Sequence, residues 1–141
     1  MNAFVTHHFL SLICIISPQR IFELAPELLP LFPFGKIYGA DSEELYESAS
    51  LKKHGAGVIK TVNAAVGMLG SDLEPLVKVL KDLGNKHKKY KAKAEHFPII
   101  GEALIHTLSI AMGDDFTPDV KTAWVMIYSV ISENMIAGMN E

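Results

Sequence analysis

The sequence predicts an all-α fold, and three observations support this prediction. From Arg20 onward, apolar residues recur at steps of three and four, which is the spacing of one face of a helix. The sequence lacks the alternating apolar runs and frequent turn residues of an all-β domain. Prolines and small polar residues fall at positions where helices begin or end. We therefore expect several helices packed around one core.

Length and composition limit the classes to which the protein can belong. The chain has 141 residues, enough for one domain with a sizeable core, and is 49% hydrophobic and 21% charged, which excludes a disordered chain. A net charge of −3 indicates no nucleic-acid partner. Cys14 is the only cysteine, which excludes an intramolecular disulfide and favours a reducing compartment. No apolar stretch reaches the ~18 residues of a membrane span, so we expect a cytoplasmic protein without a membrane partner.

The first 19 residues differ from the rest of the chain. Residues 9–16 form a short apolar stretch that Ser17 and Pro18 close. A secretory signal is one interpretation, but no Lys or Arg precedes the stretch and no clear small-residue cleavage site follows it. A buried short helix or strand, or sequence unrelated to the domain behind it, are the others. We treat residues 1–19 as an atypical apolar leader and residues 20–141 as the domain.

The first part of the domain is predicted to contain short elements. One helix ends before Pro26. Residues 26–31 are predicted to form a short helical turn between two prolines, because proline suits a first turn and stops the helix before it. Residues 33–40 include a proline and two glycines, so we expect a loop. A short helix is expected at residues 42–46.

Two longer helices are predicted in the middle of the chain. Residues 50–69 carry one apolar stripe at steps of three and four. The next helix covers residues 76–87, with Asp72 as its cap and Pro75 in its first turn. Residues 84–95 contain a glycine and many lysines, and we expect the helical pattern to break there.

Two further helices are predicted in the last third. Residues 97–112 are apolar on nearly all sides, so they should form the most buried helix. A turn follows at residues 113–115. Thr117 as cap and Pro118 at the first position then open a final helix that runs to about Gly138. Its predicted inner stripe consists of Val120, Trp124, Ile127 or Tyr128, Ile131 and Met135.

His54 and His87 are the candidate functional residues. They lie 33 residues apart, each in a helical run. Val58 follows the first histidine by one turn, and Leu83 precedes the second by one turn. A single helical histidine is more often a core or surface residue than a ligand. Two imidazoles on facing helices, however, can hold an iron porphyrin edge-on in an apolar gap, with Phe32 as an aromatic wall.

The other histidines and the lysines indicate no further defined chemistry. His7, His8, His96 and His106 lack this apolar helical setting, and the sequence has no zinc, calcium or phosphate-loop motif. The lysine-rich residues 86–93 have three interpretations. They could form a nucleic-acid or localisation patch, a solvated helix end that the helix dipole favours, or a cationic edge that neutralises the porphyrin propionates.

Five stretches give the chain a specific resemblance to a known family. In their order and spacing they are similar to a globin, and most of all to the neuroglobin-related animal globins. The resemblance covers about five sixths of the chain, from Arg20 to about Gly138. The matching stretches are residues 20–32, 83–87, 97–104, 116–118 and 123–128.

The resemblance implies roles for both histidines. His87 matches the proximal histidine that binds iron in globins. His54 matches the distal histidine, and Val58 matches the aliphatic residue beside it. In neuroglobin-like members the distal histidine can itself occupy the sixth iron position, and an external gas must then displace it. The resemblance therefore implies one metal ligand at His87 and a second, conditional one at His54.

The resemblance also implies the walls of the cofactor site and the function. Phe32 matches the phenylalanine that wedges the porphyrin, and Leu83 and Phe97 match pocket walls. The implied cofactor is haem b, and the implied function is reversible binding of oxygen or another diatomic gas for storage, transport or sensing. A redox or nitric-oxide-handling haem protein is the alternative. An enzyme is less favoured, because the chain has no second cofactor domain to supply electrons.

The sequence departs from the family at its N-terminus. The first helix and most of the second would precede Arg20, and 19 residues are too few for them. The apolar residue that roofs the distal pocket falls at Pro18. Gly55 and Gly57 should loosen the distal helix by about 1 kcal/mol each relative to alanine. We expect a divergent or misassigned leader and weaker haem retention, with a non-haem helical interaction module as the outcome if the pocket cannot hold porphyrin.

Overall fold

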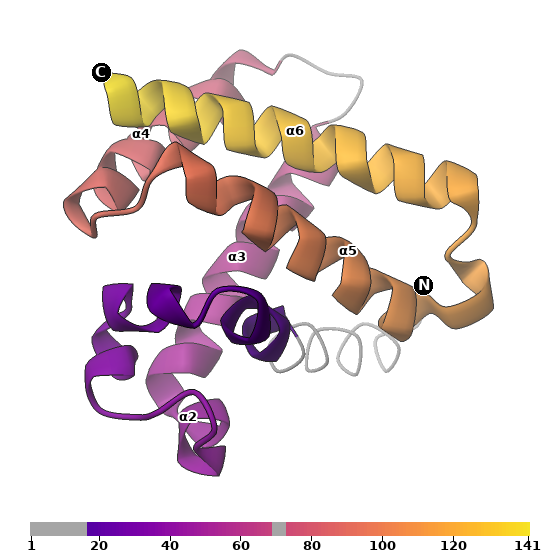
Figure 1. The fold of residues 1–141 in the computed structure, drawn as a ribbon. Coiled ribbons are helices and arrows are strands. Elements are labelled where there is room, and N and C mark those ends of the chain that lie inside the picture. The colour runs from indigo at the N-terminus through magenta and orange to yellow at the C-terminus, as the bar shows by residue number, and fades with distance from the viewer. Residues whose placement is uncertain (1–16, 69–72) are drawn as a thin grey trace.

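The chain folds into helices, as the sequence predicts. The structure is a computed structural model that describes residues 17–68 and 73–141, and its regular elements there are α-helices and 3-10 helices. In Figure 1, α5 and α6 lie side by side and run in opposite directions, while α3 crosses behind them. The four long helices are α3 (Ala49–Gly67), α4 (Glu74–Lys89), α5 (Phe97–Met112) and α6 (Pro118–Asn140).

Short elements form the N-terminal part. Residues 17–24 are helical, and η1 (Pro26–Leu31) has the predicted bounds. The predicted loop at 33–40 is only partly correct, because η2 (Pro33–Lys36) is a 3-10 helix. Its turn is closed by the N–H of Gly35 bonding to the carbonyl of Phe32, and burial of Phe34 anchors it in the core. The short helix α2 (Glu43–Glu47) follows.

Helix α3 begins at a cap that the sequence analysis did not identify. The hydroxyl of Ser48 accepts the N–H of Leu51, which satisfies one of the free donors of the first turn. The helix continues without a break through Gly55 and Gly57. The predicted last residue, Leu69, lies outside the described residues.

Helix α4 is longer than predicted. Leu73 precedes it without a side-chain cap, Pro75 lies in its first turn as expected, and the expected cap Asp72 lies outside the described residues. The helix runs to Lys89, two residues beyond the predicted end at residue 87. The chain then turns at Lys91, which adopts a left-handed φ of 64° and lies within the predicted break at residues 84–95. Gly84 does not end the helix; it is buried against α6 and serves close packing.

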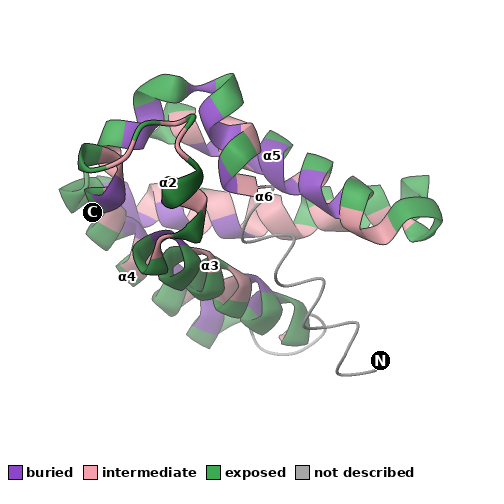
Figure 2. Ribbon diagram, turned by 90° about the horizontal axis from the view of Figure 1, so that it is seen from below, coloured by how far each residue is buried: buried purple, intermediate pink, exposed green. Residues whose placement is uncertain are grey.

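Helix α5 has the predicted bounds and is the most buried of the four long helices (Figure 2). Six of its 16 residues are buried, including the fully enclosed Thr107 and Leu108. The helix is not covered on every side, since Ile110 is 51% exposed. In the part of the chain that the structure describes, no helix combines the length and apolarity needed to span a membrane.

The final helix begins as predicted. After η4 (Gly113–Asp115), the hydroxyl of Thr117 accepts the N–H of Val120, and Pro118 takes the first helical position. Of the predicted inner stripe, Ile131 and Met135 are buried and the other members are partly buried. The most extensive helix–helix contact in the described chain joins α6 to α4, which bears His87.

The core consists of distinct apolar clusters. One cluster joins the N-terminal elements to α3, and Phe32 packs against it. A second joins α3, α4 and α6 to the start of α5, and Leu83 packs against it. A third surrounds Leu104 and Leu108, with Trp124 and Tyr128 at its edge. The candidate site residues thus lie at the margins of the first two clusters.

Candidate functional site

The imidazole of His87 is oriented by its own helix. Its Nδ1 lies 2.9 Å from the carbonyl oxygen of Leu83, one turn earlier on α4. A carbonyl oxygen can only accept, so Nδ1 carries a proton, and in the neutral ring the lone pair is then on Nε2. The backbone carbonyl of His87 accepts hydrogen bonds from the N–H groups of Tyr90 and Ala92, at 3.0 and 3.1 Å. These two bonds stabilise the C-terminal end of the helix. This arrangement presents Nε2 as a possible metal ligand.

The imidazole of His54 lies beside the aromatic ring of Phe32. The ring centroids are 5.3 Å apart and the planes meet at 77°, an edge-to-face contact between α3 and the segment that joins η1 to η2. His54 retains a large exposed surface, so its environment is partly open. Loss of hydration at the buried part of the ring, followed by the electrostatic influence of His87, lowers the pKa of His54 below its ordinary value of 6.5. The lowered pKa favours the uncharged form of the ring, which has one N–H and one lone pair.

His54 and His87 lie on two different helices, α3 and α4. An electrostatic contribution from His87 lowers the pKa of His54, which indicates that the two rings are near enough to interact. That the two residues share one binding site stays a prediction.

Phe32 is held by two other aromatic rings. It stacks on Phe34 with a centroid distance of 5.0 Å and an interplanar angle of 16°. Phe22 meets it edge-on at 5.8 Å. These contacts fix an aromatic ring next to His54, where the sequence analysis expected one wall of a porphyrin site.

The other three predicted wall residues differ in how far their side chains are buried. Phe97 is only 9% exposed and shares a cluster with Leu83, which is half-buried. Val58 lies on α3 one turn after His54 and is 38% exposed. Leu83 and Phe97 are thus part of one cluster, which does not include Val58. The roles of all six predicted site residues remain predictions.

Two tyrosines support the site and were not identified from the sequence. The ring of Tyr90, 59% exposed, meets the His87 ring edge-on at a centroid distance of 6.2 Å. The hydroxyl of Tyr128 on α6 donates to the carbonyl of Phe97 at the start of α5, and burial raises the pKa of that phenol. A tyrosine on a predicted inner stripe needs a hydrogen-bond partner, which was the available signal for Tyr128.

Two other histidines lie away from this site. Nδ1 of His96 accepts the N–H of Lys93 at 3.1 Å, so this histidine closes the η3 turn (Ala94–His96). His106 is exposed on α5. Neither has the apolar helical setting of His54 and His87.

The lysine-rich corner after His87 is solvated. Lys86, Lys88, Lys89 and Lys91 are exposed, and no ion pair engages them within the described chain. Three of them lie in the last turn of α4, where the negative end of the helix dipole favours cations. This geometry agrees with the solvated helix end that was one of the three interpretations.

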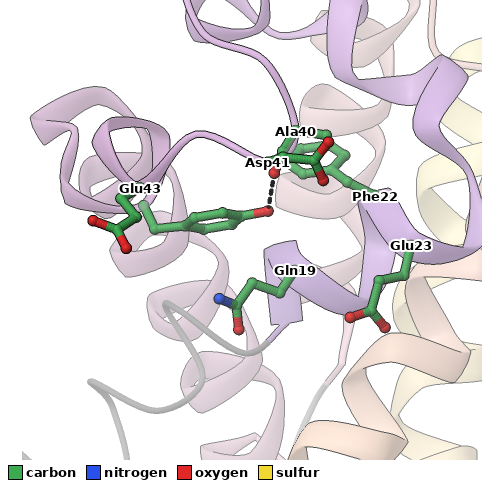
Figure 3. A pocket seen from close by; sticks show the side chains of 7 residues that line it. Gln19, Phe22, Glu23, Ala40, Asp41 and Glu43 are labelled. Carbon is green, nitrogen blue, oxygen red and sulfur yellow. Dashed lines mark hydrogen bonds between the residues drawn. The ribbon is translucent and has the colours of Figure 1, made fainter.

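A hollow of about 410 Å³ lies elsewhere, between the first described helix and α2 (Figure 3). The hydroxyl of Tyr46 at its edge donates to the carbonyl of Ala40 at 2.7 Å, and burial followed by nearby Asp41 and Glu23 raises the pKa of that phenol. None of the six predicted site residues lines it, so we do not assign the cofactor to it. Its lining residues are Gln19, Phe22, Glu23, Ala40, Asp41, Glu43 and Tyr46.

Comparison with known proteins identifies the class to which this fold and site belong. The sequence profile of the globin family matches residues 19–135. The chain therefore belongs to the globins, the family of gas-binding haem proteins, and within it is neuroglobin-like. It is 34% identical to the neuroglobins of Tetraodon nigroviridis and Danio rerio, and 32% identical to that of Dissostichus mawsoni. Each comparison covers 124 residues, which are 88% of this chain and 77% of the relative.

The residues present fit the haem that the family implies. A proximal ligand needs an imidazole whose second nitrogen is fixed by a hydrogen bond, and the Nδ1 contact of His87 with Leu83 meets this requirement. A distal residue must lie beside the apolar walls of the site, and the His54 ring contacts the ring of Phe32. The remaining walls, Phe32 and Phe97, are aromatic and are already packed in the core.

Proposed function

We propose that this chain holds haem b through His87 and reversibly binds oxygen or another diatomic gas. The observation that supports this most is the orientation of the His87 imidazole by the carbonyl of Leu83, in a chain that belongs to the globin family. The iron of a bound haem would supply the site at which the gas binds. We further propose storage, transport or sensing of the gas as the physiological role.

The two histidines would have different roles, one in holding the cofactor and the other in contacting the gas. His87 would provide the bond between protein and cofactor, since its tautomer is set by Leu83. His54 would either donate its N–H to the gas or offer its lone pair to the sixth iron position. The contact with Phe32 restrains the ring but leaves it partly exposed, so it retains room to turn between these two uses. Phe32, Leu83 and Phe97 would exclude water from the same region.

An optical spectrum of the ferrous protein reconstituted with haemin tests this proposal. We expect the wild-type chain to show a Soret band, and His87→Ala to lose most of it because the protein bond is gone. If His54 occupies the sixth position, the ferrous wild type shows sharp paired visible bands, and His54→Leu converts them to one broad band. His106→Ala is the matched control, because that histidine is exposed on α5 and should leave the spectrum unchanged.

The outcomes separate the alternatives. A wild-type chain without a Soret band would overturn the haem proposal and favour a helical interaction module. An unchanged spectrum in His87→Ala would overturn the assignment of the proximal ligand. Steady turnover of nitric oxide or nitrite with an added reductant would favour a redox enzyme over a carrier or sensor.

A further inference from the structure

Helices α4 and α6 cross at two glycines arranged reciprocally. A Cβ atom added at Gly84 on α4 would overlap the carbonyl oxygen of Met135 on α6. A Cβ atom added at Gly138 on α6 would overlap the carbonyl oxygen of Lys81 on α4. The arrangement is reciprocal: Gly84 contacts the backbone of Met135, three residues before Gly138, and Gly138 contacts the backbone of Lys81, three residues before Gly84. The two helices touch backbone to backbone, closer than the usual separation of packed helices.

This crossing lies about one helical turn before His87 on α4. Gly84 precedes His87 by three residues and follows Leu83, whose carbonyl orients the imidazole. The crossing is bordered by the buried side chains of Leu80 and Met135, which belong to the same apolar cluster as Phe97. The ion pair between Lys81 and Glu141, at 2.5 Å, ties the same two helices beside it.

A substitution that separates α4 from α6 at the crossing must also displace His87. A methyl group at position 84 cannot be accommodated by turning a side chain, because the atoms that it meets belong to the α6 backbone. The helices would have to separate by roughly 1–2 Å to restore ordinary contact distances. Helices move as rigid units over one turn, and close-packed interiors transmit such shifts. The carbonyl of Leu83 and the imidazole of His87 would therefore move with Gly84.

We propose that the reciprocal glycine crossing of α4 and α6 sets the position of the His87 imidazole, which makes Gly84 and Gly138 positioning residues for the iron ligand. This inference rests on the proposed haem function and deepens it. The position of α6 then determines how closely His87 approaches the iron, and any displacement of α6 at Met135 is transmitted to His87 within one helical turn.

The test compares Gly84→Ala and Gly138→Ala with two controls. Gly67→Ala is the matched glycine control, because a Cβ there meets nothing within 4 Å. Leu108→Ala is the stability control, because it removes a fully buried side chain on α5, away from the crossing. The readouts are the iron–imidazole stretching band of the ferrous, five-coordinate protein prepared in a His54→Leu background, and the rate of haem loss to a scavenger. Both are accompanied by the thermal midpoint of each chain.

We expect both crossing variants to shift the iron–imidazole band and to lose haem several-fold faster. Gly67→Ala should keep the band and the rate. Leu108→Ala should lower the thermal midpoint and keep the band, which separates positioning from general destabilisation. The inference is overturned, and the haem proposal stands, if both crossing variants bind haem with an unshifted band and an unchanged rate of loss.

A second measurement covers the case in which a variant folds poorly or haem does not bind. Amide hydrogen exchange of the chain without haem reports directly on the residues around His87. We expect the amides of residues 84–89 to exchange faster in both crossing variants than in Gly67→Ala, while those of α5 are unaffected. Equal protection of these amides in all three variants would overturn the inference even without haem, whereas a wild type that fails to bind haem overturns the proposed function instead.

Discussion

At the scale of single residues, the two histidines differ in how strongly their surroundings constrain them. His87 is restrained at Nδ1 by a carbonyl on its own helix and touched edge-on by Tyr90. His54 has one aromatic contact, with Phe32, and retains an exposed surface. The more constrained ring suits a permanent ligand, and the less constrained ring suits a ligand that must move aside.

A pH dependence of stability follows from His54. Its pKa in the folded chain is lower than in the unfolded chain, so the unfolded chain binds more protons at mildly acidic pH. The contribution of His54 to the free energy of unfolding is therefore fully present above about pH 6.5, the pKa of the unfolded chain. The chain loses this contribution as the pH falls from that value towards and through the lower pKa of the folded chain. Urea unfolding of the haem-free chain between about pH 5 and 8 measures it.

The substitution His54→Gln should flatten this dependence, because the titrating group is removed. His106→Gln should keep the wild-type slope, since that side chain is exposed on α5. Identical slopes in wild type and His54→Gln would contradict the assignment. The comparison uses the difference between variants, so the remaining histidines do not obscure it.

At the scale of elements, helix boundaries follow local chemistry where a cap or proline acts within the same few residues. The bounds of η1 and α5 agree with the sequence prediction, and Thr117 caps α6 as expected. The packing role of Gly84 was not predicted, because it depends on α6, which lies about fifty residues away in the sequence. Local patterns cannot reveal a partner helix.

The cap of α3 gives a test at this scale. Ser48→Ala removes the oxygen that accepts the N–H of Leu51, so we expect a loss of about 1 kcal/mol in the free energy of unfolding. Ser50→Ala is the matched control, because Ser50 lies exposed inside the helix, where alanine is the better helix former. Chemical denaturation of both variants checks the prediction, and equal stability of the two would contradict it.

At the scale of the whole molecule, the candidate site lies between two apolar clusters. Phe32 packs against the cluster of the N-terminal elements, whereas Leu83 and Phe97 belong to the cluster of α4 and α6. A flat apolar group bound between them would join both clusters. We therefore expect haem to stabilise the entire fold rather than one helix.

This expectation can be measured through ligand linkage. A free haem concentration 100-fold above the dissociation constant should raise the free energy of unfolding by about 2.7 kcal/mol, because haem binds the folded chain. Thermal unfolding at several haem concentrations should show a rising midpoint for wild type and for His106→Ala. His87→Ala should show a much smaller rise. A midpoint independent of haem in the wild type would contradict the expectation.

The sequence by itself determined the helical class, the order of the elements, most helix starts and the two candidate histidines. These features depend on periodicity, prolines and caps, all of which act over a few residues. Only the tertiary structure decided that the carbonyl of Leu83 orients the His87 ring, that the His54 ring meets Phe32, and that Gly84 and Gly138 join α4 to α6. These depend on contacts between residues far apart in the chain, and the distances between such residues are set by packing rather than by sequence spacing.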